Sequence, residues 1–295
     1  SIVVLFFFFV LFALFRGMEL MLKDSVLGIL ISLLMFTSPV LVYYGNNFLM
    51  NIPSFSMALS GLYFFFRFWQ SEKYRFFILS CVFYGLAGLL KLPGLLSFLA
   101  IGLLFTGERF NITLSEKGRV FKKPVRDLLV MGLVLLPALG WYLYVDWYNR
   151  VNNSGFFLVG ILPLWEASYQ QIGETLDAVW WHIKWDYFRP GSQLIFVLMW
   201  IAVVFYLSRR SLIKWLILFI SLGMLIFLFL FFNALKEHDY YVINLYILIP
   251  LVIAGFFMVL KSRSPLLYRS WLLRILFCVP CMFFTYRVQV PSGPG

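Results

Sequence analysis

The sequence predicts an all-α membrane protein, a polytopic transmembrane helical bundle of about ten spans. Of the 295 residues, 62% are hydrophobic and only 13% are charged, which is more apolar surface than one soluble core can bury. Apolar runs of about 15 to 20 residues recur along the chain, each long enough to cross or nearly cross a hydrocarbon layer of about 30 Å. None of these runs alternates polar and apolar residues as a barrel strand does, and a helix satisfies its own backbone hydrogen bonds in lipid.

Ten apolar runs give the expected order of the spans. They cover residues 2–15, 26–44, 54–68, 76–90, 93–106, 128–145, 193–207, 215–232, 242–260 and 271–286. The first run starts at Ser1 with no initiator methionine and no charged segment ahead of it, so it is not interpreted as a signal peptide. We expect a fragment or processed chain whose residues 1–295 form a single integral membrane domain.

The 24 basic residues are divided unevenly between alternate loops. If the richer set of loops faces the cytoplasm, the basic residues left outside are Lys91, Arg150, Lys184, Arg189, Lys236 and Arg287. This asymmetry follows the positive-inside rule, so the formal charge of +11 mainly indicates orientation. The basic loop at residues 109–126 is interpreted as an ordinary cytoplasmic loop, and no nucleic-acid partner is expected. The short loops and the lack of a eukaryotic targeting mark favour a bacterial inner membrane.

The longest outer loop, residues 146–192, is rich in tryptophan and carboxylates. Apolar and charged residues mix within 174–188, which predicts an amphipathic helix lying flat at the level of the lipid headgroups. One interpretation is an aromatic belt that anchors the protein in the interface. The other is a helix that roofs a cavity and presents Arg189, just before Pro190-Gly191, to a headgroup or a sugar.

Lys91 follows the apolar run 76–90 and precedes the break Leu92-Pro93-Gly94, on the face assigned to the outside. A cation near a membrane usually persists because an anion meets it, although it can also snorkel to water.

Two further outer segments are candidate binding sites. Asn51 precedes Ile52-Pro53 at the start of a span, where it could also be a simple helix N-cap. Residues 236–241 form a dense polar cluster between two spans, which could also be a solvated turn. Its members are Lys236, Glu237, His238, Asp239, Tyr240 and Tyr241.

The cysteines predict neither a disulfide framework nor a zinc site. Cys81, Cys278 and Cys281 all lie in apolar runs, and the CxxC spacing of the last two has no second pair. No metal ligand is assigned from the sequence.

Three motifs together resemble a known family. Asn51-x-Pro53 opens a span, Gly-Leu-Ala-Gly-Leu-Leu leads into Lys91-x-Pro-Gly, and His238-x-Tyr240-Tyr241 precedes a span that bears Pro250. In this order, over residues 26–260, the motifs resemble the polytopic GT-C class of glycosyltransferases. More narrowly, they are similar to the superfamily of protein mannosyltransferases and aminoarabinose transferases.

The resemblance implies transfer of a sugar from a polyisoprenyl phosphate carrier to a lipid, glycan or protein acceptor on the extracytoplasmic face. Lys91, with help from Arg189 or Lys236, would hold the carrier phosphate as its bond to the sugar breaks. Asn51, His238, Asp239, Tyr240 and Tyr241 would contact the carrier or the sugar.

Two departures concern the chemistry that the resemblance implies. The family's catalytic carboxylate lies in the first outer loop, so we expect it upstream of Ser1, with the first span and that loop missing from this fragment. Many relatives have Asp where Asn51 stands, and an amide cannot ligate a cation or take a proton as a carboxylate does. A divalent cation therefore has no assigned ligand, and Asp186, Glu237 and Asp239 remain candidate carboxylates on the outer side.

Other function classes are compatible with the same features. A transporter or flippase of a lipid-linked or anionic substrate also needs a membrane cavity with a cation, but it predicts internal repeats and helices broken near the midplane. The sequence shows no such repeat. A polymerase or ligase of surface polysaccharide would share the lipid carrier, and a non-catalytic assembly subunit would fit Asn at position 51.

Overall fold

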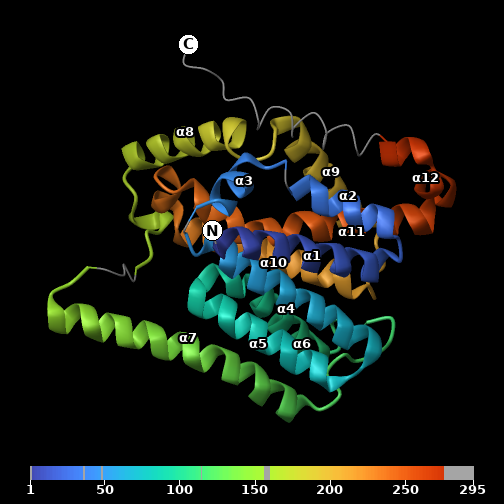
Figure 1. Cartoon of the computed structure of the whole chain (residues 1–295), viewed down its shortest axis with the longest axis horizontal. Helices are drawn as coiled ribbons and strands as arrows, with labels where there is room; N and C mark the ends of the chain where they lie inside the picture. The colour runs from blue at the N-terminus through green and yellow to red at the C-terminus, as the bar shows by residue number, and fades with distance from the viewer. Residues whose placement is uncertain (1, 36, 48, 114, 156–159, 276–295) are drawn as a thin grey trace.

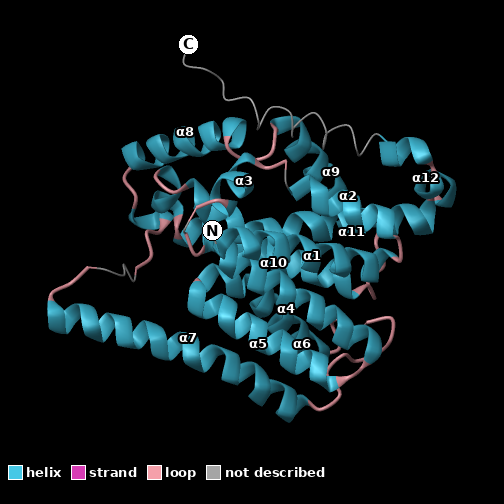
Figure 2. Cartoon of the chain, viewed as in Figure 1, coloured by secondary structure: helices cyan, strands magenta, loops and turns pink. Residues whose placement is uncertain are grey.

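The computed structural model describes residues 2–35, 37–47, 49–113, 115–155 and 160–275 (Figure 1). The described chain is helical with no named strand, which confirms the all-α prediction (Figure 2). The elements in order are α1 Ile2–Leu22, α2 Ser25–Met35, α3 Pro39–Gly45, α4 Asn51–Ser71, α5 Tyr74–Leu90, η1 Leu92–Leu95, α6 Leu96–Arg109, α7 Pro124–Asn152, η2 Leu164–Glu166, α8 Tyr169–Trp185, α9 Pro190–Tyr206, α10 Leu212–Leu230, η3 Phe232–Lys236, η4 Asp239–Ile247, α11 Leu248–Arg263 and α12 Pro265–Arg269.

Several of these helices could cross a membrane, as an integral membrane protein requires. Among the described residues, 5 are long and apolar enough, and up to 7 spans result if the bent pairs α2–α3 and α8–α9 each count as one. The 5 are Val3–Leu22, Leu92–Arg109, Pro124–Asn152, Leu212–Leu230 and Asp239–Arg263.

The predicted count of about ten spans is not confirmed. Helix α5 has only 17 residues. Helix α4 has 21, but its serines together with Asn51, Arg67 and Gln70 lower its hydropathy. Most of the predicted span 271–286 and the Cys278/Cys281 pair lie outside the described residues.

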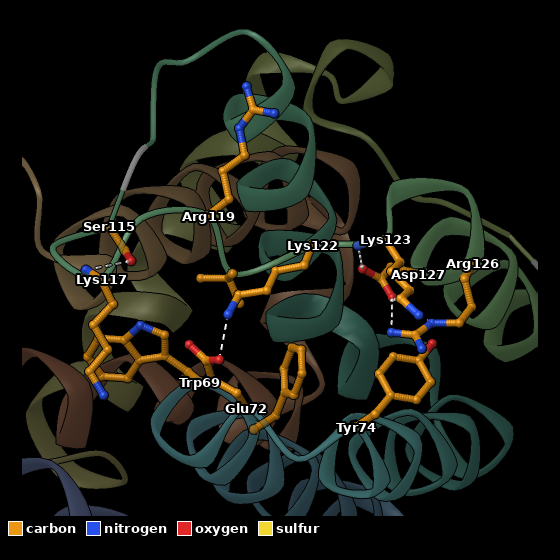
Figure 3. Close-up of a pocket in the computed structure, with 12 residues that line it drawn as sticks. Trp69, Glu72, Tyr74, Ser115, Lys117, Arg119, Lys122, Lys123, Arg126 and Asp127 are labelled. Carbon is orange, nitrogen blue, oxygen red and sulfur yellow. Dashed lines mark hydrogen bonds and ion pairs between the residues drawn. The ribbon is translucent and has the colours of Figure 1, made fainter.

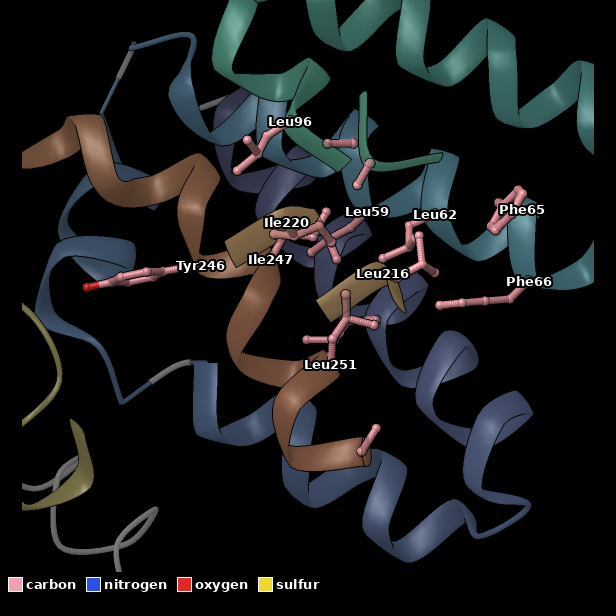
Figure 4. Close-up of a cluster of buried hydrophobic side chains, with 14 of the residues drawn as sticks. Leu59, Leu62, Phe65, Phe66, Leu96, Leu216, Ile220, Tyr246, Ile247 and Leu251 are labelled. Carbon is pink, nitrogen blue, oxygen red and sulfur yellow. The ribbon is translucent and has the colours of Figure 1, made fainter. Parts of the chain in front are cut away.

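Helix α4 lies at the centre of the bundle, and its buried side chains meet those of α10 and α11 (Figure 4). Leu59 and Leu62 of α4 face Leu216 of α10 and Leu251 of α11 in this core. Against α5, Gly61 lets the Tyr84 ring approach so closely that an added Cβ would lie 2.9 Å from it. Such small residues matter in a membrane protein, because helices in lipid associate by close packing rather than by the hydrophobic effect.

Hydrogen bonds between helices fix their relative directions. The Ser56 hydroxyl donates to the Phe6 carbonyl over 3.1 Å, and the Gln70 amide donates to the Leu20 carbonyl over 2.8 Å, so α1 and α4 run parallel. Helix α5 returns in the opposite direction. We call the two ends of this group the Asn51 end and the Ser71 end, and the 21 residues of α4 separate them by about 30 Å.

Helices α7 and α8 lie at the periphery of the molecule (Figure 1). Helix α7 packs on α5 and leaves many apolar side chains exposed, including Leu129 and Leu133. Helix α8 begins with a capping box between Ser168 and Gln171, and it makes an angle of 96° with α9. A helix therefore lies in the segment where an interfacial helix is predicted, and Trp180 on it is 66% exposed.

Candidate functional site

Lys91 lies at the Asn51 end, where the chain leaves α5. Its amide still donates to the Ala87 carbonyl over 2.9 Å, but its backbone is extended, with φ of −163°, and the short helix η1 follows. Pro93 has no N–H to continue the ladder of α5. Gly94 then packs so tightly on α4 that an added Cβ would lie 2.3 Å from the Ser54 hydroxyl oxygen. This contact fixes the backbone that carries Lys91.

The Lys91 side chain turns back onto α4 and η4. Its Nζ donates to Asn51 Oδ1 over 3.0 Å and lies 4.7 Å from the ring centroids of both Tyr240 and Tyr241. Asn51 Nδ2 donates to the Tyr240 carbonyl over 2.9 Å, so the amide connects the lysine to η4. A desolvated cation–π contact contributes up to about 2 kcal/mol, which makes the ring faces significant partners.

Aromatic stacking extends this group to His238. The His238 ring stacks on Tyr241 with centroids 5.3 Å apart and lies 5.1 Å from the Tyr240 ring. We call Asn51, Lys91, His238, Tyr240 and Tyr241 the Lys91 cluster. The structure thus brings together residues from three sequence motifs, and it rules out the N-cap interpretation of Asn51, because Met50 is the N-cap and Asn51 is already helical.

Asp239 is connected to the cluster through Tyr44. The Tyr44 hydroxyl of α3 donates to Asp239 Oδ1 over 2.6 Å, and the Tyr44 ring packs edge-on against Tyr240 with centroids 5.5 Å apart. Asp239, Tyr240 and Tyr241 are therefore part of helix η4, whereas Glu237 and His238 form the short connection from η3, in which Glu237 is exposed.

Among the described residues, no carboxylate neutralises Lys91. In the part of the chain that the structure describes, none of the ion pairs includes Lys91, and its partners are an amide oxygen and two neutral rings. Burial lowers the pKa of Lys91 from 10.5 to about 8. A positive charge in this state gains from any anion that approaches it, because the anion offsets the cost of desolvation.

Lys236 and Arg189, predicted to assist Lys91, lie in other surroundings. Lys236 binds Glu174 of α8 with an N–O distance of 2.5 Å, and this hydrogen bond raises the pKa of Lys236 and lowers the pKa of Glu174. Arg189 is the residue before α9. Among the described residues, no hydrogen bond or ion pair joins either side chain to Lys91, so their assistance stays a prediction.

An apolar cavity of about 440 Å³ shares helix η4 with the Lys91 cluster, although no residue of the cluster lines it. Helix η4 presents Tyr240 and Tyr241 to Lys91, and its following residues Val242 and Leu245 line the cavity. Val179 and Ile183 of α8 also line it, as expected for a helix that roofs a cavity. Most of the remaining wall comes from α9, α10 and α11, and it is mainly apolar, so the space suits a hydrocarbon chain.

The sequence does not predict two polar features near the cluster. Tyr44 and Asp239 pair across 195 positions, and no local pattern relates them. Asn244 of η4 is 2% exposed, and its amide atoms have no hydrogen-bond partner among the described residues. For the buried Asn244 amide, the only signal in the sequence is a single asparagine within an apolar run of valine, isoleucine and leucine.

A metal site is not evident, since within the described ranges no three His, Cys, Asp or Glu side chains gather closely enough to hold an ion. No protein-family model matches this chain, and neither a curated protein nor a solved structure is similar to it. The functional argument therefore depends on the geometry of the Lys91 cluster and its neighbouring cavity.

Proposed function

We propose that this chain is a glycosyltransferase that takes its sugar from a polyisoprenyl phosphate carrier. The observation that supports this most is the state of Lys91, a partly buried cation that contacts Asn51, Tyr240 and Tyr241 and has no carboxylate partner in the described chain. The phosphate of the carrier supplies the missing negative charge. This function agrees with the resemblance of the three motifs to the GT-C class.

The adjacent cavity accounts for the lipid part of the donor. Its lining is almost entirely apolar, and it shares helix η4 with the Lys91 cluster. A carrier that lays the first isoprenoid units in the cavity reaches Lys91 with its phosphate. Binding energy from the remote chain then positions the sugar–phosphate bond beside the cluster.

In the transfer step, an acceptor hydroxyl attacks the anomeric carbon as its proton passes to a base. The bond between the sugar and the phosphate oxygen breaks, and its electron pair stays on the phosphate. Lys91 stabilises this developing charge through its ammonium group, which is in place before the reaction. Tyr240 and Tyr241 keep the ammonium in position without neutralising it.

Asp239 is the described carboxylate that connects to the cluster, through Tyr44 and through its neighbour Tyr240. It is our candidate for the base within these residues. Asp186 is less suited, because it already pairs with His182 over 2.6 Å, and Glu237 is exposed. We place the Asn51 end of the bundle outside the cytoplasm, in a bacterial inner membrane.

Binding of undecaprenyl phosphate by the protein in lipid nanodiscs tests this function, with neutral undecaprenol as the reference lipid. We expect the phosphate form to bind more tightly, and Lys91→Met to lower its affinity about tenfold or more, the effect of losing a charge-assisted hydrogen bond. Lys184→Met is the matched control, because Lys184 is also a lysine beside an aromatic ring, 4.9 Å from that of Trp185. Equal affinity for the two lipids would contradict the proposal.

Transfer itself is measured with radiolabelled undecaprenyl phosphate sugars and a membrane extract as acceptor. We expect labelled product from the wild-type protein and little from Lys91→Met or Asp239→Asn. Movement of labelled lipid between leaflets without any product would identify a transporter instead, and would overturn the transferase function while leaving the binding site intact.

A further inference from the structure

A second pocket lies at the Ser71 end of the bundle, about 30 Å from the Lys91 cluster along α4 (Figure 3). It has a volume of about 250 Å³ and is formed by the end of α4, the start of α5, the loop after α6 and the start of α7. Five basic residues and two carboxylates line it. These are Lys117, Arg119, Lys122, Lys123 and Arg126 with Glu72 and Asp127.

The two carboxylates are already used by the protein. Glu72 pairs with Lys122 at 2.5 Å. Asp127 is buried, accepts from the Lys123 backbone amide over 3.2 Å and pairs with Arg126 at 3.3 Å. The other three basic side chains, those of Lys117, Arg119 and Lys123, have no ion-pair partner among the described residues. The pocket therefore carries excess positive charge.

Aromatic side chains form the walls between these charges. The Lys117 ammonium lies 5.4 Å from the ring centroid of Trp69, and the Arg126 guanidinium lies 3.3 Å from that of Tyr74. In Figure 3, Lys117 runs beside the indole, and Lys122 and Glu72 are next to it. The Trp69 Nε1 is buried and has no hydrogen-bond partner within the described residues. An indole N–H can only donate, so it needs an acceptor.

The position of the pocket indicates the source of that acceptor. Two candidate membrane spans meet here, because Leu92–Arg109 ends and Pro124–Asn152 begins on either side of the loop. Apolar side chains on the first turns of α7 are exposed next to the pocket, with Val125 at 72% and Leu129 at 66%. The pocket thus lies at the end of the apolar bundle, where lipid phosphates lie, with apolar surface beside it for acyl chains.

We propose that this pocket binds the phosphate of an anionic phospholipid. Lys117 supplies positive charge to the phosphate oxygens, and Trp69 Nε1 beside it donates a hydrogen bond to one of them. Lys123 lies on the other side of the pocket, beside Asp127 (Figure 3), and adds to the positive charge that attracts the phosphate. The acyl chains lie along the exposed face of α7. The site is independent of the proposed transferase function, and its ligand remains at the opposite end of α4 from the Lys91 cluster.

Native mass spectrometry of the detergent-solubilised full chain tests this site, with dioctanoyl phosphatidate as the probe. Glycerol phosphate presents the same phosphate without acyl chains, and dioctanoyl phosphatidylcholine presents the chains with a zwitterionic headgroup. We expect phosphatidate to bind more tightly than either. Glycerol phosphate binding as tightly as phosphatidate would identify a soluble anion as the ligand and overturn the assignment to a lipid.

Variants assign the binding to this pocket. Lys117→Met with Lys123→Met removes one charge-assisted contact and one further positive charge of the pocket, and is expected to weaken phosphatidate binding about tenfold or more. Arg209→Met with Arg210→Met removes two exposed charges from the loop between α9 and α10 and is expected to change it little. Trp69→Phe keeps an aromatic ring beside Lys117 but removes the N–H donor together with part of the indole. It is expected to lower the affinity about tenfold, so it tests the site even if the double variant folds poorly. Unchanged binding in folded Trp69→Phe and in the folded lysine variant would overturn the proposal.

Discussion

The Tyr44 hydroxyl donates to Asp239 Oδ1 over 2.6 Å. This hydrogen bond connects α3 to η4, although the two residues are 195 positions apart in the chain. Asp239 directly precedes Tyr240 in the chain, and the Tyr240 ring contacts both Tyr44 and Lys91. The hydrogen bond therefore helps to hold Tyr240 in place. The pair thus supports Tyr240 and, through it, the Lys91 cluster.

Replacing Tyr44 tests how much this support contributes. Tyr44→Phe removes the donor and is expected to lower the free energy of unfolding by about 1.5 to 3 kcal/mol, the range for a hydrogen bond to a charged group. Thermal and denaturant unfolding in detergent measure the change. Tyr43→Phe is the control, because Tyr43 is 65% exposed and its hydroxyl makes no hydrogen bond among the described residues. Equal effects of the two changes would show that the Tyr44 hydrogen bond has no special role.

The contact of Gly94 with Ser54 predicts opposite results for two glycines near Lys91. Gly94→Ala places a Cβ 2.3 Å from the serine oxygen in a buried site, so we expect destabilisation by about 1 to 3 kcal/mol, as for other overpacked cores. Gly85→Ala in α5 meets nothing within 4 Å and is expected to stabilise the helix by about 0.5 to 1 kcal/mol. Unfolding measurements on both variants decide this, and Ser54→Ala should partly restore Gly94→Ala.

The lowered pKa of Lys91 predicts how binding depends on pH. Because burial lowers this pKa to about 8, the charged form becomes scarce above that pH. The affinity for undecaprenyl phosphate should therefore fall as pH rises through about 8, approaching tenfold per pH unit until the pKa of the bound state is reached. A phosphate monoester is already a dianion there, so its own titration does not cause the loss. Lys91→Arg should bind equally across this range, and a wild-type affinity that does not change with pH would contradict the role of Lys91.

Stability should change in the opposite direction over the same pH range. The unfolded state binds a proton on Lys91 up to about pH 10.5, whereas the folded state releases it near pH 8. Between these values the unfolded state binds more protons, so the free energy of unfolding rises with pH. Lys91→Met removes this contribution. We expect the free energy of unfolding of Lys91→Met, minus that of the wild type, to decrease from about pH 8 to about pH 10, because only the wild type gains stability over this range. Denaturant unfolding measures both values.

Asn51→Asp tests whether Lys91 must remain without a carboxylate. The new carboxylate would lie where Asn51 Oδ1 accepts from Lys91 over 3.0 Å, and the amide donor to the Tyr240 carbonyl would be lost. We expect an ion pair with Lys91 that competes with phosphate, and affinity for undecaprenyl phosphate about tenfold weaker. Asn46→Asp is the control, since its amide donates only to the Val42 carbonyl over 3.2 Å and is not part of the Lys91 cluster. An unchanged affinity in Asn51→Asp would show that the amide has no role in keeping the cation available.

The sequence predicts the helices better than it predicts how many cross the membrane. Residues 193–207 and 215–232 were expected as spans, and helices α9 and α10 cover nearly the same residues. The same kind of apolar run predicts a span at 54–68, and the buried helix α4 covers it, but α4 is not among the candidate spans of the described chain. A run of apolar residues reports only that the segment avoids water, and a neighbouring helix satisfies it as well as lipid does.

Some features of the candidate site can be predicted from the sequence, and others cannot. The motifs at Asn51, Lys91 and residues 238–241 are visible in the sequence because polar residues interrupt apolar runs there, and the fold brings them together. The separation of Lys236 from Lys91 is not visible, because the same lysine can pair with either a ligand or Glu174. From the sequence, the basic loop at 109–126 indicates only orientation. In the structure, its basic residues line a pocket together with Trp69 of α4 and Tyr74 of α5.

Local composition is enough to predict an all-α chain with several apolar helices able to cross a membrane, because hydrophobic runs and the need to pair backbone groups are local properties. Which charges remain without a partner follows instead from the tertiary structure. Whether a lysine meets a carboxylate, an amide or a ring depends on helices far apart in the chain, such as α4 and η4 around Lys91. Electrostatic energy depends on these distances and on burial, and neither is encoded in spacing along the sequence.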